Sequence, residues 1–156
     1  MTEQKRRVVV TGLGVVSPVG HTLDETWNNL INGVHGIALI TLFDTTDYKA
    51  KLAAEVKDFN PRDYMEKQEI LRSDRFSQLA IAAASQAVEE SGIMGTVAPE
   101  RFAVYFGTGI GGVTTITKEH RKLFDKGPGR VSPYLVPMMI ANMAAGMTAK
   151  VLQCLP

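Results

Sequence analysis

Cysteine is almost missing from this sequence, which contains only Cys154. A single cysteine excludes an internal disulfide and any zinc site built on several cysteines. The sequence also lacks an apolar run of the roughly 18 residues that a membrane-spanning helix needs. Its first residues, MTEQKRRVVVTG, do not have the architecture of a signal peptide. Together these absences predict a protein that is soluble and cytoplasmic.

An excess of charge of one sign is missing as well. The 156 residues carry 17 Lys and Arg against 16 Asp and Glu, a net charge of +1. Because these charges are scattered along the chain, we expect neither a nucleic-acid partner nor a membrane partner. Hydrophobic residues make up 45% of the chain, and a domain of about this length buries roughly 68–70% of its unfolded surface. Length and composition therefore allow one globular domain.

The sequence does contain two apolar stretches that each run into a cluster of glycines. They are residues 6–16, RRVVVTGLGVV, and residues 101–112, RFAVYFGTGIGG. Short apolar runs bounded by glycine predict strands that are covered on both faces of a sheet. Glycines at the end of such a strand predict a loop that a ligand or another backbone approaches closely. A plain connection from strand to helix is the alternative interpretation.

The first glycine cluster also resembles half of a dinucleotide-binding fingerprint. Ser17 stands where that fingerprint has its third glycine, and Pro18 follows it. Proline at this place argues against a helix that opens on the cofactor phosphates. We therefore expect no nicotinamide or flavin site, and the sequence predicts no metal site.

Local signals predict a helix over residues 23–32. Thr22 and Glu25 form a capping box, in which Thr22 accepts from the third helical amide and Glu25 accepts from the amide of Thr22. Residues 34–63 show a looser pattern, which predicts irregular structure with a possible short strand over 52–56.

Two longer helices are predicted further along the chain. A stripe of alanines and larger apolar residues predicts a helix over 73–91, capped by Ser73 or Asp74 and packed against a sheet or another helix. A second helix is predicted over 113–124, with its charged residues exposed: Lys118, Glu119, Arg121 and Lys122. The nearly uncharged segment 138–149 is expected to be buried on almost all sides.

Motifs spread over most of the chain resemble those of one family. In chain order they are 6–14 (RRVVVTGLG), 17–20 (SPVG), 43–45 (FDT), 107–112 (GTGIGG), 132–137 (SPYLVP) and 140–146 (IANMAAG). In this combination and order they are similar to the first part of the β-ketoacyl-acyl-carrier-protein synthases, the elongating condensing enzymes of type II fatty-acid synthesis.

The resemblance implies an α/β, thiolase-like fold. This chain would supply an incomplete first half of a layered αβαβα arrangement, and the full-length protein would be a homodimer. The implied reaction is a Claisen condensation, in which a cysteine takes the acyl chain from acyl-carrier protein and decarboxylated malonyl-carrier protein attacks the thioester. The implied partners are acyl-carrier protein and the acyl and malonyl thioesters, with no cofactor.

The catalytic groups of the family have no match in this chain. The family's nucleophile lies in a Thr-Ala-Cys segment that would follow Pro156, and Cys154 resembles a position before it. The resemblance therefore implies an N-terminal domain over 1–156 that is truncated before the nucleophile and inactive by itself. We assign no catalytic role to any of the isolated histidines, His21, His35 and His120. The alternative is a non-catalytic module that dimerises or binds carrier protein, and a nucleotide-dependent oxidoreductase is a more distant hypothesis.

Several binding residues are implied by position. Ile110, on a loop with Gly109, Gly111 and Gly112, matches the mouth of the acyl pocket, and core packing is its alternative. Leu135 matches a position that lines the partner's acyl pocket across the dimer, with ordinary interface packing as the alternative. The residues that match or flank a carrier-docking patch are Lys67, Arg72 and Arg130. The alternative interpretation is that these three residues are ordinary solvent-exposed charges with no role in docking.

Overall fold

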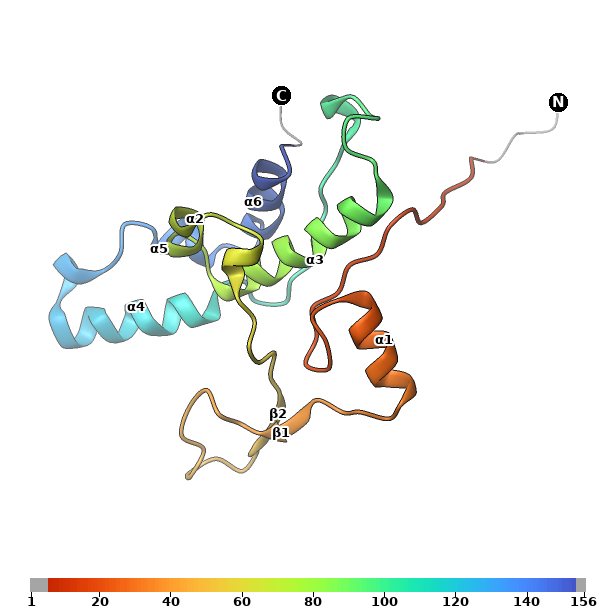
Figure 1. The fold of residues 1–156 in the computed structure, drawn as a ribbon. Helices are drawn as coiled ribbons and strands as arrows, with labels where there is room; N and C mark the ends of the chain where they lie inside the picture. Colours follow the sequence, from red (N-terminus) through yellow and green to blue (C-terminus); the bar gives the residue numbers. More distant parts are fainter. Residues whose placement is uncertain (1–5, 154–156) are drawn as a thin grey trace.

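A computed structural model of the chain describes residues 6–153. Helix α3 lies at its centre with α6 against it, while α4 and α5 lie on one side and α1 on the other (Figure 1). A small hairpin of β1 and β2 projects away from the helices. The elements in chain order are α1 (Leu23–Ile31), β1 (Ile37–Leu39), β2 (Leu52–Ala54), η1 (Pro61–Asp63), α2 (Lys67–Leu71), α3 (Arg75–Ser91), η2 (Pro99–Arg101), α4 (Val113–Lys126), η3 (Pro128–Arg130), α5 (Leu135–Met139) and α6 (Met143–Val151).

The predicted first helix is confirmed, with one difference at its cap. Thr22 Oγ1 accepts from the Glu25 amide at 3.3 Å, as the capping box predicts. Glu25 Oε2, however, accepts from the amide of His21 at 2.7 Å, one residue before the expected donor. The side chain of Glu25 therefore fixes the backbone of His21, the residue before the N-cap.

The core lies between α3 and α6. Ile81 and Ala82 of α3 are fully buried, and Ala144 and Thr148 of α6 are 2% and 1% exposed. Small side chains at this interface let the two helices approach closely. The helix predicted over 73–91 is thus confirmed. Its N-cap is Asp74, whose side chain accepts from the Phe76 amide, and Gly92 in the left-handed conformation ends it.

The N-terminal segment packs directly on the backbone of α3. A Cβ atom on Gly14 would lie 1.9 Å from the carbonyl oxygen of Ala83, so no larger residue fits there. Gln86 of α3 holds the same segment, because its Oε1 accepts from the Val15 amide at 3.2 Å and its Nε2 donates to the His21 carbonyl at 2.7 Å. The glycine turn is therefore a packing surface for α3.

Two predicted strands are wrong. Residues 6–10 and 102–106 adopt no strand, and the sheet of the described part of the chain is the antiparallel pair β1–β2. Within residues 6–153, no backbone hydrogen bond joins 8–10 or 103–106 to another segment. Val8 is 91% exposed and Tyr105 is 96% exposed. An apolar run becomes a strand only where a second backbone lies beside it, and here none does.

The apolar segment 138–149 also differs from the prediction. It is divided between α5 and α6, and Ala141 and Asn142 between these helices are exposed. Only Ala144 and Thr148 of α6 are buried, on the face that contacts α3. The segment is therefore buried along one stripe. The short strand expected over 52–56 is confirmed as β2, which ends at Ala54.

Candidate functional site

The loop 107–112 is held at its C-terminal end by α5. Gly112 donates its amide to the Met139 carbonyl at 2.9 Å, and a Cβ atom on Gly112 would lie 2.2 Å from the Met138 carbonyl oxygen. Gly111 has a φ of 79° and donates to Thr108 Oγ1 at 3.2 Å. Both glycines are buried. The close approach of α5 explains why no side chain is tolerated at Gly112.

The first half of the same loop is open. Apart from the residues next to it in the chain, no described residue has an atom within 4 Å of the position that a Cβ atom on Gly109 would take. Ile110 is 71% exposed, so it does not pack in a core formed by the described residues. The structure therefore presents Ile110 on a short exposed segment next to a firmly anchored one. Its role at the mouth of an acyl pocket stays a prediction.

Leu135 is the first residue of α5 and is half-buried. It lies at the opposite end of this helix from Met139, which binds the loop, and four residues of helical rise separate them by about 6 Å. The ring of Tyr134, just before Leu135, lies under the guanidinium of Arg72 at 4.9 Å. Helix α5 thus connects the loop 107–112, the predicted acyl-pocket residue and one predicted docking residue.

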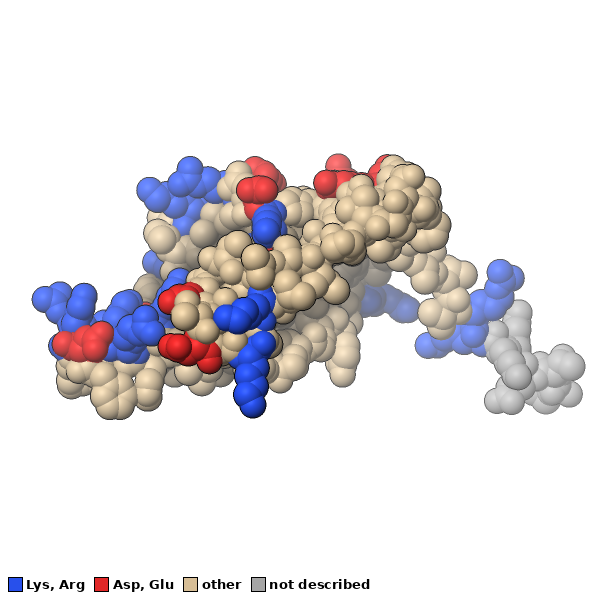
Figure 2. Space-filling view, turned by 90° about the horizontal axis from the view of Figure 1, so that it is seen from below, with Lys and Arg blue, Asp and Glu red and all other residues tan. Residues whose placement is uncertain are grey.

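The three predicted docking residues are exposed and lie on different elements. Lys67 begins α2, Arg72 caps its C-terminus, and Arg130 lies in η3. Figure 2 shows basic side chains over the side of the molecule formed by α4, with acidic ones between them. The structure brings Arg72 to Tyr134 at the start of α5, whereas Arg130 lies on a separate element.

Sequence reasoning missed the role of Glu119, which it placed on an exposed helix face. The side chain of Glu119 is only 8% exposed. Its Oε1 binds Lys122 Nζ at 2.5 Å, and its Oε2 accepts from the Ser132 amide at 2.7 Å. The hydrogen bond from Lys122 and then that from Ser132 lower the pKa of Glu119 below its ordinary value. Glu119 therefore ties the segment that leads into α5 to helix α4. No local sequence signal indicates this contact.

Asp74 makes a second contact that the sequence did not reveal. It is 5% exposed, and its Oδ1 accepts from the Phe76 amide at 3.4 Å. Its Oδ2 accepts from the Thr115 amide of α4 at 2.7 Å. One carboxylate thus meets the amino ends of two helices. The N-cap role was predictable, whereas the contact with Thr115 depends on how α3 and α4 pack.

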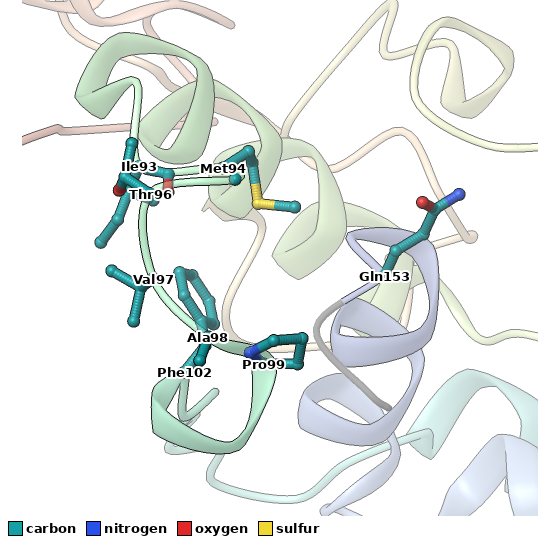
Figure 3. Close-up of a pocket in the computed structure, with 9 residues that line it drawn as sticks. Ile93, Met94, Thr96, Val97, Ala98, Pro99, Phe102 and Gln153 are labelled. Carbon is teal, nitrogen blue, oxygen red and sulfur yellow. Dashed lines mark hydrogen bonds between the residues drawn. The ribbon is translucent and has the colours of Figure 1, made fainter.

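A hollow of about 350 Å³ lies away from all of these residues. Figure 3 shows that it is lined by the loop after α3 and by Gln153 from the end of α6. Among residues 6–153, its lining contains no titratable side chain and none of the predicted site residues: it consists of Ile93, Met94, Gly95, Thr96, Val97, Ala98, Pro99, Phe102 and Gln153. The described part of the lining therefore offers no side chain that titrates near neutral pH.

The remaining candidate groups give no catalytic arrangement. His21 and His120 pack edge-on against Phe59 and Phe124 at 6.2 and 4.7 Å between ring centroids. Cys154 lies outside the described residues. Residues 6–153 contain no group of three or more His, Cys, Asp or Glu side chains that could hold a metal ion. No helix in the described part of the chain is long and apolar enough to cross a membrane.

Known proteins match this chain over nearly its whole length. It is 46% identical over 147 residues to the 3-oxoacyl-[acyl-carrier-protein] synthase 2 of Staphylococcus aureus strain COL, which covers 94% of this chain and 36% of the relative. It is 43% identical over 147 residues to the protein of the same name from Synechocystis, covering 94% of this chain and 35% of the relative. The chain therefore spans little more than a third of the length of these relatives.

The structure leads to the same group of proteins. The ishigamide ketosynthase/chain length factor matches 98% of this chain and 38% of its own chain, with a TM-score of 0.82 and 29% identity. The predicted α/β, thiolase-like fold class is thus confirmed. Residues 5–154 match the family model described as Beta-ketoacyl synthase, N-terminal domain. On this match the chain belongs to the β-ketoacyl synthase family.

Proposed function

We propose that this chain is the N-terminal portion of a 3-oxoacyl-acyl-carrier-protein synthase, which condenses acyl thioesters with malonyl-carrier protein in fatty-acid elongation. The observation that carries the proposal is the match of residues 5–154 to the N-terminal domain of the family. The 46% identity to a synthase from Staphylococcus aureus supports the acyltransferase chemistry. In this proposal one domain occupies residues 1–156, the protein works in the cytoplasm, and the full-length enzyme is a homodimer.

In this proposal, the residues of this chain contribute to the reaction by binding the acyl chain. Ile110 borders the acyl pocket, and Gly109 gives the loop around it an open side. Leu135 lines the acyl pocket of the partner subunit. Neither residue carries a titratable group, so both act by contact with the acyl chain. We propose no catalytic residue within this chain, and we propose that the chain alone does not form a carbon–carbon bond.

A condensation assay tests the last point. The purified chain is incubated with an acylated carrier protein and malonyl-carrier protein, and 3-oxoacyl product is measured by mass spectrometry. We expect no product above the background without protein. The synthase from Staphylococcus aureus is the positive control. Product formed by the chain alone would show that it holds a complete catalytic site.

Carrier-protein binding tests the proposal more directly. We expect the chain to bind acyl-carrier protein, which is the acidic partner of Lys67, Arg72 and Arg130. Reversal of one charge, in Lys67→Glu or Arg72→Glu, is expected to weaken binding by about twofold to tenfold. Added salt is expected to weaken wild-type binding, because it screens exposed charges.

The matched control for these variants is Lys49→Glu. Lys49 is exposed in the loop between β1 and β2 and belongs to no predicted site. Its reversal changes the net charge by the same amount, so it corrects for general attraction between chain and carrier. Equal losses in Lys49→Glu and Arg72→Glu would remove Arg72 from the docking site. No binding by the wild-type chain would count against the proposed function.

A further inference from the structure

We propose that Asp74 is a positioning residue, which sets the place of Ile110 by capping helix α4 from a distant part of the chain. The role of Ile110 in acyl binding rests on the proposed function, whereas the capping itself does not. Asp74 and Thr115 are 41 positions apart in sequence. Each is 5% exposed. Their hydrogen bond is therefore shielded from water and specific to the folded chain.

Helix α4 lacks a cap of its own. The first amides of any helix have no partner inside the helix, and a Ser, Thr, Asp or Asn at the N-cap usually accepts from one of them. The N-cap of α4 is Gly112, which has no side chain. Steric contact with α5 explains this glycine, since a Cβ atom there would meet the Met138 carbonyl oxygen. Helix α4 must therefore take its cap from elsewhere, and Asp74 Oδ2 supplies it through the Thr115 amide at 2.7 Å.

The charge of Asp74 fits this place. No Lys or Arg in residues 6–153 forms an ion pair with it. Its carboxylate instead faces the amino ends of α3 and α4, which have 17 and 14 residues. A helix amino end carries partial positive charge and favours a nearby anion. The carboxylate thus accepts from the amino ends of both helices and joins them.

The loop that carries Ile110 enters α4 at this point. Its anchored end has two attachments: the Gly112 amide bonds Met139 of α5, and the Thr115 amide bonds Asp74. Ile110 lies two residues before Gly112 and is itself 71% exposed. Because its side chain is exposed, the backbone anchors beside it set its position. Loss of the Asp74 bond leaves the attachment to α5 and the bond from the Gly111 amide to Thr108 Oγ1 within the loop.

Asp74→Ser separates this role from ordinary capping. Serine is a good N-cap for its own helix, so α3 keeps its cap. Its side chain is one atom shorter and has one oxygen, so it cannot also reach Thr115. Asp74→Ala removes both bonds. The measurement is hydrogen exchange of individual amides in the 156-residue chain, compared with wild type.

We expect the Thr115 amide to exchange about tenfold to a hundredfold faster in both variants, since a hydrogen bond to a charged group is lost. The Phe76 amide is expected to exchange faster only in Asp74→Ala. Amides of α1 are expected to stay unchanged and serve as the internal control. Unchanged exchange at Thr115 in Asp74→Ser would overturn the proposal, and so would an equal rise at every amide. If Asp74→Ser does not fold, Asp74→Asn decides by the same criteria, because it keeps the shape and replaces Oδ2 by a donor.

A binding measurement connects Asp74 to Ile110. Affinity is compared for carrier protein with and without a long acyl chain. In Asp74→Ser we expect the preference for the acylated form to be lost, while affinity for the unacylated form stays that of wild type. A preference equal to that of wild type would overturn the positioning of Ile110. If the wild-type chain binds neither form, the proposed function fails, and the exchange result still decides whether Asp74 caps α4.

Discussion

At the scale of single residues, buried polar side chains differ in whether their polar atoms have hydrogen-bond partners. Glu119 has both carboxylate oxygens occupied, one by Lys122 and one by the Ser132 amide. Thr148 is the opposite case. Its Oγ1 is buried and has no hydrogen-bond partner among residues 6–153. A buried polar atom without a partner costs free energy. These two residues therefore give predictions of opposite sign.

Replacing Thr148 by valine is expected to stabilise the chain. Valine has nearly the same shape, so the packing against α3 is kept while the unpartnered hydroxyl is removed. We expect the free energy of unfolding to rise by about 1 kcal/mol. Thr117→Val is the control, since Thr117 is exposed and donates to the Val113 carbonyl at 2.9 Å. Urea denaturation measures both, and a loss of stability in Thr148→Val would show that the hydroxyl has a partner.

The lowered pKa of Glu119 makes part of the stability depend on pH. Because the folded chain favours the ionised form, the contribution of Glu119 is fully present above the ordinary value of 4.5. It is lost as the pH falls below 4.5 toward the lowered pKa. We expect Glu119→Gln to be less stable than wild type at neutral pH and the difference to shrink in acid. Glu100→Gln, which removes an exposed carboxylate from η2, is the control. A difference that stays constant with pH would contradict the assignment.

At the scale of elements, two glycines allow one segment of backbone to pack directly on another. Gly14 lets the N-terminal segment lie on α3, and Gly112 lets the loop lie on α5. In both places the atom that a Cβ would meet is a backbone carbonyl oxygen, which cannot rotate away as a side chain can. The elements can separate only if the backbone moves. Substitution of these glycines is therefore expected to change tertiary packing rather than helix content.

Gly14→Ala and Gly146→Ala form a matched pair. The first places a methyl group 1.9 Å from the Ala83 carbonyl oxygen, and we expect a loss of about 1–3 kcal/mol of stability. Gly146 lies within α6, and a Cβ atom there meets no atom of the described residues within 4 Å outside the backbone of its own helix. Alanine favours helix over glycine, so this variant is expected to gain about 0.5–1 kcal/mol. Thermal or urea unfolding measures both, and a neutral Gly14→Ala would show that this segment does not pack on α3 in solution.

The whole molecule exposes more surface than its mass predicts. Its accessible surface is 11703 Å², about 1.5 times the roughly 7,700 Å² expected for a folded monomer of its 17.0 kDa mass. Large apolar side chains contribute to the excess, among them Val8, Val10 and Tyr105 at 91%, 78% and 96% exposed. Monomeric proteins rarely leave so much apolar surface in contact with water. The chain alone is therefore expected to be marginally stable.

This excess surface can be tested with the purified chain. We expect it to bind a hydrophobic dye at neutral pH, to self-associate as its concentration rises, and to unfold over a broad temperature range. Dye fluorescence, light scattering and calorimetry measure the three properties. A monomer with a sharp cooperative transition and no dye binding would contradict the prediction, because such a chain must bury its apolar residues.

Helices were predictable here because their signals are local. Thr22, Asp74 and Gly92 lie within a few residues of the helix ends that they cap, so reading the chain in order finds them. The strands expected over 6–10 and 102–106 were wrong for the converse reason. Their sequences suit a strand, but a strand also needs a neighbouring backbone, which composition cannot supply. The burial of segment 138–149 has no such local signal, because it depends on which face of α6 meets α3.

The sequence by itself determined the family, the helices and their caps, because each depends on residue types at short spacing and on motifs in a fixed order. Only the tertiary structure decided that Asp74 caps α4, that Glu119 holds the Ser132 amide, and that α5 clamps the loop before α4. These contacts join residues that are distant in the chain. They depend on how the helices pack, and helix packing is set by the shape of whole surfaces rather than by any short pattern of residues.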